Sequence, residues 1–501
     1  MLILPATAAF WLLNAAASAA ASAPHRPSKL VVCDDVADPA TLDPQREFSE
    51  KNHTIVQQIF EGLVRFDPDG KIVPALATNW RPMNDHTVRF QLRKGVVFQN
   101  GEPFDAESVR YSVSRYLDPG MNFPARGFID PIDRVVAIDD HTVDIVTKRH
   151  DSLLLNRLAG FIVMVPPKHY SSHTESFLKT HPIGTGPFKF VRWDTGKDIV
   201  LTAFERYWDP GLPRLKTLEF DFLPPREQMA ALFTGKVDIL TDLPGTATLQ
   251  VMRHAGTTAV KKRSYYTVAA TINTSSAPLS SLAFRRALNY AIDRDQLIRY
   301  DANGNGVALG SLAMPGETGY DPSIAPYPFD LGKAERLMRQ TGFRRPVKLR
   351  GFASSQAART ARIIAKQWEE IGVHLELHVF PESRLMNEIH GGHWDIGFGF
   401  LPDPIVHASF IQGLLLYSKS PYSLFHSEDY DRRYESWTSA ATPSADEKEG
   451  AALDRYVHSN ALSIFTYQRV RTYGMRAGIR FVPSVTGMDS FRAASWRTEK
   501  P

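Results

Sequence analysis

Cysteine is almost absent from this chain, which has Cys33 alone among 501 residues. A disulfide within the chain is therefore excluded, and a chain of this length does not need one because it can bury a large core. The composition is compatible with either a reducing or an oxidising compartment. Cys33 lies far from the start and follows Val32, where a lipid-anchoring signal requires a small residue. We therefore expect no lipidation and interpret Cys33 as a buried strand thiol.

Long runs of one charge are also missing. The 58 basic and 54 acidic residues leave a formal charge of +4, and the basic clusters at 261–263 and 344–345 are short and isolated. Nucleic-acid binding surfaces require a longer basic stripe, so these clusters are typical of solvated surface. We expect no nucleic-acid partner. The length itself predicts two or three lobes rather than one core.

After the first 23 residues, no stretch approaches the roughly 20 continuous apolar residues of a membrane helix. Residues 2–13 are mostly apolar, an alanine- and serine-rich segment follows, and 19–21 offers a small-x-small cleavage site. The basic residue usual near the start is missing, because Arg26 is the first one. We predict a cleaved signal peptide over residues 1–23 and export to the periplasm. An uncleaved anchor is the alternative.

Motifs of phosphate binding and nucleophilic catalysis are incomplete. The Gly-Thr-Gly at 184–186 lacks the third glycine and the following helix of a dinucleotide-binding loop. Ser176 and Lys179 have the S-x-x-K spacing of penicillin-recognising serine enzymes, but no K-T-G accompanies them. We therefore predict no catalytic residue, no bound metal and no cofactor. A serine hydrolase that uses Ser176 and Lys179 remains one hypothesis.

Residues 181–240 form the most strongly patterned stretch. The sequence Pro-Ile-Gly-Thr-Gly-Pro at 182–187 predicts a sharp turn in which the glycines adopt positive φ, and we interpret it as a hinge between lobes. Residues 188–204 predict a β-hairpin. Residues 226–234 have helical spacing and precede Gly235, which suits a left-handed position at the helix end.

Residues 347–400 predict a repeated strand–helix unit. Strands are indicated at 347–352, 373–379 and 394–400, with helices at 357–371 and 382–390 between them. Short connections of this kind make the strands parallel. Since parallel sheets place their cleft outside the carboxyl ends of the strands, this geometry points to residues 398–407 as a ligand site.

Two further segments give local predictions. Val88, Phe90 and Leu92 alternate with polar residues, which indicates a half-buried strand, and Asp105 suits the N-cap of the next helix. Residues 284–299 predict one helix with an apolar face.

Several segments together resemble the family 5 extracellular solute-binding proteins, which are peptide, nickel and oligosaccharide receptors of ABC importers. These segments occur in the family's order. The first two are the Thr-Leu-Asp-Pro at 41–44 and the stretch 74–109. The others are the IGTGPF at 183–188 with the Arg-Tyr-Trp at 206–208 and the Gly-Lys-Val-Asp at 235–238, the Asn-Thr at 273–274 with the ALNYAIDR at 287–294, and the Asp-Pro at 403–404. The resemblance covers nearly all of the chain after about residue 28.

The resemblance implies an α/β fold, a class II periplasmic-binding-protein-like clamshell with mixed and parallel sheets in three lobes. Lobe I would comprise 28–50, 182–267 and 475–501. Lobe II would be the inserted segment 51–181, and lobe III would be 268–474. Lobes I and III would close over the ligand by a hinge motion.

The resemblance and the sheet geometry together give a set of expected ligand-binding residues: Thr41, Leu42, Tyr266, Asn273, Phe398, Gly399, Phe400, Asp403 and His407. Peptide-binding members of the family carry an aspartate three residues before the acidic residue of the Asp-Pro loop, where it pairs with the peptide amine. This chain has Phe400 there. Because a desolvated ammonium without a counter-charge costs several kcal/mol, binding of a free amino terminus is put in doubt. A small shift in this correspondence, with Asp403 pairing with the amine, is the alternative.

The resemblance implies a monomeric substrate-binding protein that captures an oligopeptide-like solute and delivers it to the membrane permease subunits of an ABC importer. The same fold could instead bind a metal chelate, an opine or a glycoside, for which Phe400 and the histidines, His407 among them, are better suited.

Overall fold

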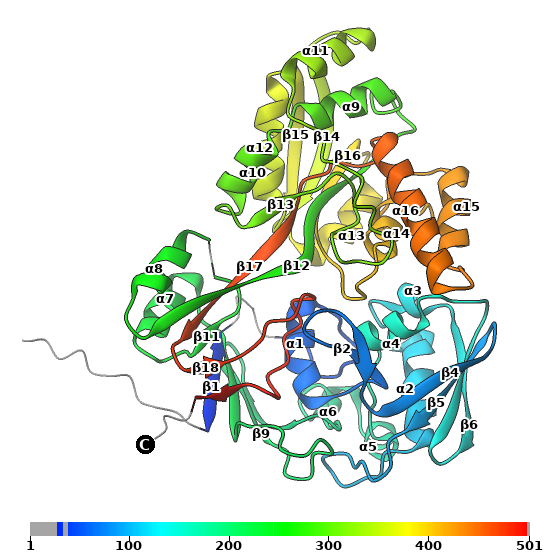
Figure 1. Cartoon of the computed structure of the whole chain (residues 1–501), viewed down its shortest axis with the longest axis vertical. Helices are drawn as coiled ribbons and strands as arrows, with labels where there is room; N and C mark the ends of the chain where they lie inside the picture. Colours follow the sequence, from blue (N-terminus) through cyan, green and yellow to red (C-terminus); the bar gives the residue numbers. More distant parts are fainter. Residues whose placement is uncertain (1–27, 34–38, 244, 498–501) are drawn as a thin grey trace, which may run out of the picture.

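The computed structural model of the chain describes residues 28–33, 39–243 and 245–497. The segment predicted as a signal peptide, residues 1–23, lies outside them. Figure 1 shows an upper body, which contains β13 to β16 and α9 to α16, and a lower body, which contains β1 to β11, α1 to α8 and the C-terminal strands β18 and β19.

One mixed sheet of 11 strands runs through both bodies. Two long antiparallel neighbours, β12 (Thr257–Ile272) and β17 (Tyr467–Arg476), cross from the lower to the upper body (Figure 1). On the β12 side the sheet continues, from its edge inward, with β15 (Val373–Phe380), β14 (Val347–Ser354) and β16 (Ile396–Pro402). On the β17 side it continues outward with β11 (Ile239–Leu240), β1 (Lys29–Cys33), β10 (Thr217–Asp221), β9 (Asp198–Ala203) and β8 (Phe188–Asp194). The short strand β13 (Gly306–Ala308) also pairs with β17.

A separate four-stranded antiparallel sheet lies in the lower body, in the order β4 (Ala77–Asn84), β5 (Thr87–Leu92), β7 (Thr142–Thr147) and β6 (Ile132–Asp139). The predicted alternation of β5 is confirmed, because Phe90 and Leu92 are buried and Val88 is half-buried. Asp105 caps the following helix as predicted, with its side chain accepting from the backbone N–H of Ser108. Two short pairs complete the strands: β2 (Val64–Phe66) with β3 (Ile72–Pro74), and β18 (Ile479–Arg480) with β19 (Ser495–Trp496).

Helices flank these sheets. The lower body has α1 (Glu50–Ile59), α2 (Ala106–Leu117), α3 (Arg126–Ile129), α4 (Leu154–Phe161), α5 (Pro167–Ser172), α6 (Glu175–Leu178), α7 (Pro225–Phe233) and α8 (Thr248–Arg253). The upper body has α9 (Leu282–Tyr290), α10 (Arg294–Asp301), α11 (Leu331–Gln340), α12 (Ala358–Glu369), α13 (Glu382–Gly391), α14 (Ser409–Leu416), α15 (Glu428–Trp437) and α16 (Pro443–Ser459). Among the described residues, no helix is both long enough and apolar enough to cross a membrane.

The predicted strand–helix unit at 347–400 is confirmed. β14 pairs in parallel with β15 on one side and with β16 on the other. Gly372 ends the first connecting helix with a φ of 73°. The hairpin of β8 and β9, the helix α7 and the positive φ of Gly235 are confirmed as well, and Cys33 is a buried free thiol in β1.

The prediction of positive φ at Gly184 and Gly186 is wrong, because neither glycine adopts it. Their small size is required for packing instead. A Cβ on Gly184 would lie 2.1 Å from the carbonyl oxygen of Ile59, and one on Gly186 would lie 2.6 Å from the carbonyl carbon of the same residue. The backbone N–H of Gly186 also donates to the Ile59 oxygen at 2.8 Å. The Gly-Thr-Gly turn is therefore a close contact with the end of α1.

Glu61, which follows α1, also connects this helix end to the Gly-Thr-Gly turn. Its buried carboxylate accepts hydrogen bonds from the Tyr207 hydroxyl at 2.7 Å, the Trp208 indole at 2.8 Å and the Thr185 hydroxyl at 3.0 Å. One acidic side chain thus joins α1, the Gly-Thr-Gly turn and the Arg-Tyr-Trp segment.

The prediction of one helix over 284–299 is also wrong, since the chain breaks between α9 and α10. Asp293 caps α10 by accepting from the backbone N–H of Gln296 at 2.8 Å. The buried guanidinium of Arg294 donates to the carbonyl oxygens of Asn289 at 3.1 Å and Tyr327 at 2.9 Å. These bonds replace the helical ones that a continuous helix would make at this point.

Candidate ligand-binding site

The structural centre of the candidate site is an irregularity in β12. The register of β12 against β17 shifts between Arg263 and Thr267, beside the point where the strands pass between the two bodies. At this shift the backbone N–H of Tyr265 donates to Val485 at 2.8 Å, and its carbonyl accepts from the N–H of Asp403 at 2.7 Å. The bulge therefore holds together the C-terminal segment, β12 and the Asp-Pro loop.

An aromatic pair lies beside this bulge. The ring centroids of Tyr266 and Phe400 are 5.4 Å apart, and Phe400 is the more exposed of the two. The Arg469 guanidinium lies 5.6 Å from the Phe400 ring centroid and donates to Asp242 at 2.8 Å. The Arg471 guanidinium lies 5.6 Å from the ring of Tyr266. Sequence reasoning did not include either arginine, because they lie on β17, far away in the chain.

Asp403 lies at the same place but is completely buried. Its Oδ1 accepts from the backbone N–H groups of Ile405 at 2.8 Å and Val406 at 3.1 Å, and its Oδ2 accepts from that of His407 at 2.7 Å. Burial and the neighbouring Asp403 carboxylate raise the pKa of Glu317. The pKa of Asp403 is raised to about 6, chiefly by burial. Asp403 therefore organises its own loop and does not face solvent.

His407 is engaged inside the upper body. Its Nδ1 is 2.8 Å from the Ser409 hydroxyl and its Nε2 is 3.1 Å from a carboxylate oxygen of Asp446. The ring packs against Trp437 at a centroid distance of 5.1 Å, and the residue is 1% exposed. Both ring nitrogens thus have partners within the protein.

The remaining expected residues are not part of the aromatic pair, although Gly399 adjoins Phe400 in β16. Phe398 is fully buried and packs toward Trp368, with Gly399 next to it in β16. Asn273 follows the far end of β12, where its N–H donates to the Asp395 carbonyl, about 23 Å along the strand from Tyr266. Thr41 is half-buried and Leu42 is buried in the lower body, shortly after the undescribed residues 34–38. The structure thus brings together Tyr266, Phe400 and Asp403, and it places Asn273 elsewhere.

Ser176 and Lys179, the basis of the hydrolase hypothesis, are exposed residues at the short helix α6. Within the described ranges, no hydrogen bond joins the two side chains. A nucleophile needs a base within hydrogen-bonding reach, so the pair lacks the geometry of an activated serine.

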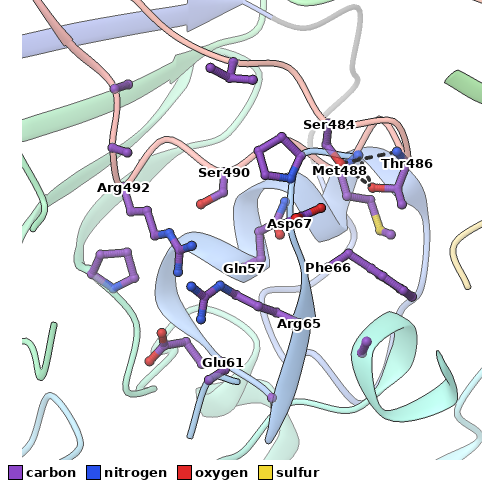
Figure 2. A pocket seen from close by; sticks show the side chains of 18 of the residues that line it. Gln57, Glu61, Arg65, Phe66, Asp67, Ser484, Thr486, Met488, Ser490 and Arg492 are labelled. Carbon is purple, nitrogen blue, oxygen red and sulfur yellow. Dashed lines mark hydrogen bonds between the residues drawn. The ribbon is translucent and has the colours of Figure 1, made fainter. Parts of the chain in front are cut away.

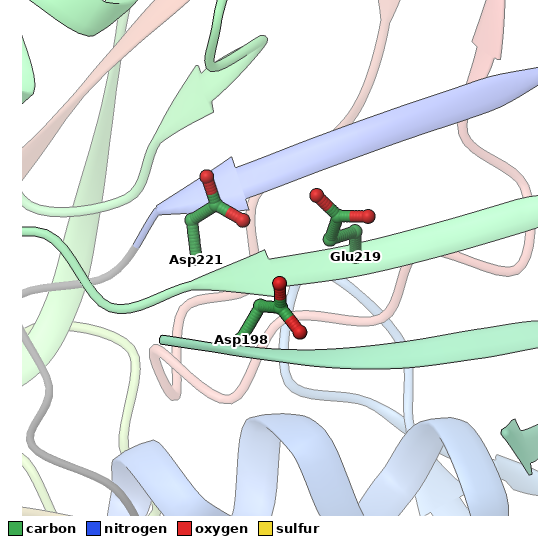
Figure 3. A group of neighbouring side chains, drawn as sticks. All are labelled: Asp198, Glu219 and Asp221. Carbon is green, nitrogen blue, oxygen red and sulfur yellow. The ribbon is translucent and has the colours of Figure 1, made fainter. Parts of the chain in front are cut away.

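Three carboxylates gather on the face of β9 and β10, as Figure 3 shows. Asp198, Glu219 and Asp221 have oxygens that all lie within 4.8 Å of one another. Arg192 donates to Asp198 at 3.1 Å and Lys29 forms an ion pair with Glu219 at 2.7 Å, so two of the three charges are already balanced. The pKa of Asp221 is raised to about 6 by burial and by Glu219. The register explains this cluster, because Asp198 pairs with Asp221 across the strands.

A mixed sheet that passes between two bodies on β12 and β17, with an aromatic pair at the crossing, has the architecture of periplasmic ligand-binding receptors. The chain belongs to the bacterial extracellular solute-binding proteins of family 5. The family model described as "Bacterial extracellular solute-binding proteins, family 5 Middle" matches residues 71–420.

Individual relatives agree with this assignment. The glutathione-binding protein GsiB of Pectobacterium atrosepticum is 27% identical over 389 residues, which cover 76% of this chain and 75% of that protein. The structure of the periplasmic binding protein DppA from Helicobacter pylori in complex with the peptide STSA has a TM-score of 0.82 and 21% identity, covering 94% of this chain and 99% of that one. The structure of AgaA from Agrobacterium tumefaciens R10 in complex with agropinic acid has a TM-score of 0.81 and 22% identity, with the same coverage. At these identities the two structures show a shared fold.

Proposed function

We propose that this protein is the substrate-binding component of an ABC importer, which captures a small peptide-like solute and releases it chemically unchanged to the membrane permease subunits. Membership of the solute-binding family is the observation that carries this proposal. The exposed position and missing base of Ser176 support a binding protein rather than an enzyme. The protein would act in the periplasm as a monomer, after removal of residues 1–23 and without lipidation.

The proposed mechanism is closure of lobe III, residues 268–474, over lobe I, which comprises 28–50, 182–267 and 475–501, with 51–181 as the inserted lobe. The strands β12 and β17 support it, since they pass between the two bodies and could bend as a pair. A micromolar affinity would correspond to about −8 kcal/mol of binding free energy. The expected contact at the crossing is made by the half-buried Phe400, whose ring packs against the buried Tyr266, and Thr41 is expected to contribute from the lower body.

The site favours a solute that presents no ammonium group to Phe400. A phenylalanine offers area and stacking but no counter-charge, and Asp403 is buried with both oxygens engaged. The nearby Arg469 guanidinium donates to Asp242 and has further N–H groups that suit a carboxylate of the solute. An opine or another acidic solute is therefore the second candidate, and this arginine is the observation that favours it.

The experiment is isothermal titration calorimetry with glutathione, an opine, free-amine dipeptides and N-acetylated dipeptides, followed by mass analysis of the recovered ligand. The proposal expects saturable binding of at least one of these classes and recovery of the intact molecule. Hydrolysis of a bound peptide or ester, lost on Ser176→Ala, would instead establish the hydrolase.

A further inference from the structure

A cavity lies in the lower body, and no residue of β12 or β17 lines it. It has a volume of about 390 Å³ and is enclosed by α1, β2 and the C-terminal segment 480–494 (Figure 2). None of the residues expected to bind the transported solute lines it. Its volume falls within the range of small-molecule sites in proteins.

The charged lining of this cavity is unbalanced. Four arginines line it, Arg65, Arg214, Arg480 and Arg492, against two carboxylates, Glu61 and Asp67. In the part of the chain that the structure describes, none of the four guanidinium groups forms an ion pair with a carboxylate. Arg65 and Arg492 are half-buried and extend toward one another in Figure 2, while Arg214 and Arg480 are exposed.

The protein compensates the charge of Arg65 only in part. Arg65 donates to the Pro74 carbonyl at 2.7 Å, but its Nε is buried and has no hydrogen-bond partner. Burial and then the charge of Arg492 lower the pKa of Arg65, while the charges of Glu61 and Asp209 act in the opposite direction and do not reverse the shift. Leaving two like charges partly desolvated is costly unless a counter-charge lies between them.

Within the described residues, neither carboxylate of the lining forms an ion pair with Arg65 or Arg492. The carboxylate of Glu61 already accepts three hydrogen bonds, from Thr185, Tyr207 and Trp208. Oδ1 of Asp67 accepts from the backbone N–H groups of Asp69 and Lys71, both at 2.9 Å, and so holds the turn after β2. Arg65 and Arg492 therefore keep guanidinium N–H groups that an external anion could accept from.

The rest of the wall is mixed: polar residues such as Gln57, Ser484 and Ser490 alternate with apolar ones, and the apolar part restricts the kind of anion. The apolar lining residues include Phe60, Val64, Phe66, Val163, Phe481 and Met488. A fully hydrated inorganic ion would leave this surface unused. A molecule with an oxyanion head and a compact apolar body would use both parts of the wall.

We propose that this cavity is a second ligand site, which binds a small organic anion with its carboxylate or phosphate head between Arg65 and Arg492 and its apolar body against Phe60 and Phe481. The occupant would join α1 and β2 to the C-terminal segment. That segment also receives the hydrogen bond from Tyr265 at the crossing, through Val485. Binding would therefore stabilise the segment that supports the crossing strands.

The test is calorimetric titration of the full chain with hexanoate, hexyl phosphate, hexanol and hexylamine. We expect one saturable site for at least one of the two anions and none for hexanol or hexylamine. Comparison of hexanoate with hexyl phosphate shows which head group the site prefers. Equal binding of hexylamine and the anions, or no binding of either anion at millimolar concentration, would overturn the proposal.

Variants locate the site. Arg65→Gln and Arg492→Gln should each weaken anion binding by about tenfold, while Arg226→Gln, an 84% exposed arginine on α7, should leave it unchanged. Unchanged anion affinity in both Arg65→Gln and Arg492→Gln would refute the assignment. If these two variants do not fold, a crystal soaked with 6-bromohexanoate replaces them. An anomalous bromine peak inside the cavity supports the site, and a peak only elsewhere refutes it.

Discussion

At the scale of single residues, the proposed function places Phe400 against the solute at the crossing. We expect Phe400→Asp to raise the affinity for free-amine dipeptides by about tenfold, because the new carboxylate supplies the missing counter-charge. Calorimetry measures the change. Leu249→Asp adds the same charge at a site on α8 that is 60% exposed, and it should have no effect. Identical affinities for Phe400→Asp and the unmodified protein would show that another residue occupies the amine-facing position.

Asp221 gives a prediction about pH. Its pKa is raised to about 6 from the ordinary value of 3.8, so the folded state disfavours the ionised form. This destabilising contribution is absent near pH 4, grows as the pH rises, and is complete above pH 6. Asp221→Asn should therefore be more stable than the unmodified protein at pH 7.5, by on the order of 1 kcal/mol after allowance for solvent screening, and the gain should vanish near pH 4.

Urea denaturation at several pH values checks this prediction. Asp85→Asn, an exposed turn residue, is the matched control and should show no pH-dependent gain. A gain for Asp221→Asn that is as large at pH 4 as at pH 7.5 would mean that the carboxylate cluster in Figure 3 does not impose this penalty.

The structural roles of single residues could be predicted from the sequence where those roles depend only on nearby residues. The cap formed by Asp105 and the left-handed Gly235 depend on neighbours within a few positions, and both are confirmed. The engagement of His407 by Asp446 depends on a residue on another helix. Such contacts depend on the tertiary fold, so no local pattern could show that the ring nitrogens are occupied.

At the scale of elements, the Gly-Thr-Gly turn packs directly against the C-terminal end of α1. Gly184→Ala should lower the free energy of unfolding by about 3 kcal/mol, because the new methyl group would overlap the carbonyl of Ile59. Gly127→Ala is the control, since a Cβ there meets nothing within 4 Å. Chemical denaturation of both variants provides the comparison. Equal stability would mean that the turn moves away from α1 at little cost.

Periodicity predicted those elements whose apolar residues follow one face. The unit from β14 to β16 is such a case, and its parallel pairing follows from its short connections. The same reasoning failed between α9 and α10. There the buried Arg294 takes the carbonyl groups of Asn289 and Tyr327, an arrangement that apolar spacing cannot indicate.

At the scale of the whole molecule, the lower and upper bodies also touch away from the crossing strands. Asn156 donates to the Ile405 carbonyl at 2.8 Å, and the rings of Phe128 and Phe410 are 4.5 Å apart. These contacts connect α3 and α4 with the Asp-Pro loop and α14. They join the two bodies at a second place besides the strands β12 and β17.

Removing the aromatic contact should shift the protein toward an open state. We expect Phe410→Ala to increase the radius of gyration in small-angle scattering of the unliganded protein, and added solute should reverse the increase. Phe425→Ala removes a buried ring from the same core without touching α3, and it should leave the radius unchanged. An equal radius for Phe410→Ala and Phe425→Ala would mean that this contact does not hold the bodies together.

The family and the fold class could be predicted because the matching segments are contiguous and occur in a fixed order. The contact between Phe128 and Phe410 and the arginine-lined cavity could not be predicted from the sequence. Both join side chains that are hundreds of positions apart, such as Arg65 and Arg492, and nothing in the local sequence indicates that these two residues meet.

The most direct test of the central claim, that the chain holds a solute without altering it, is native mass spectrometry of the protein purified from the periplasm. The account predicts a protein–solute complex of one-to-one stoichiometry, from which mild denaturation releases a small molecule that rebinds to fresh protein with its mass unchanged. A released molecule that fresh protein converts to a product of different mass would contradict the account, and so would a folded protein that neither carries nor rebinds any small solute.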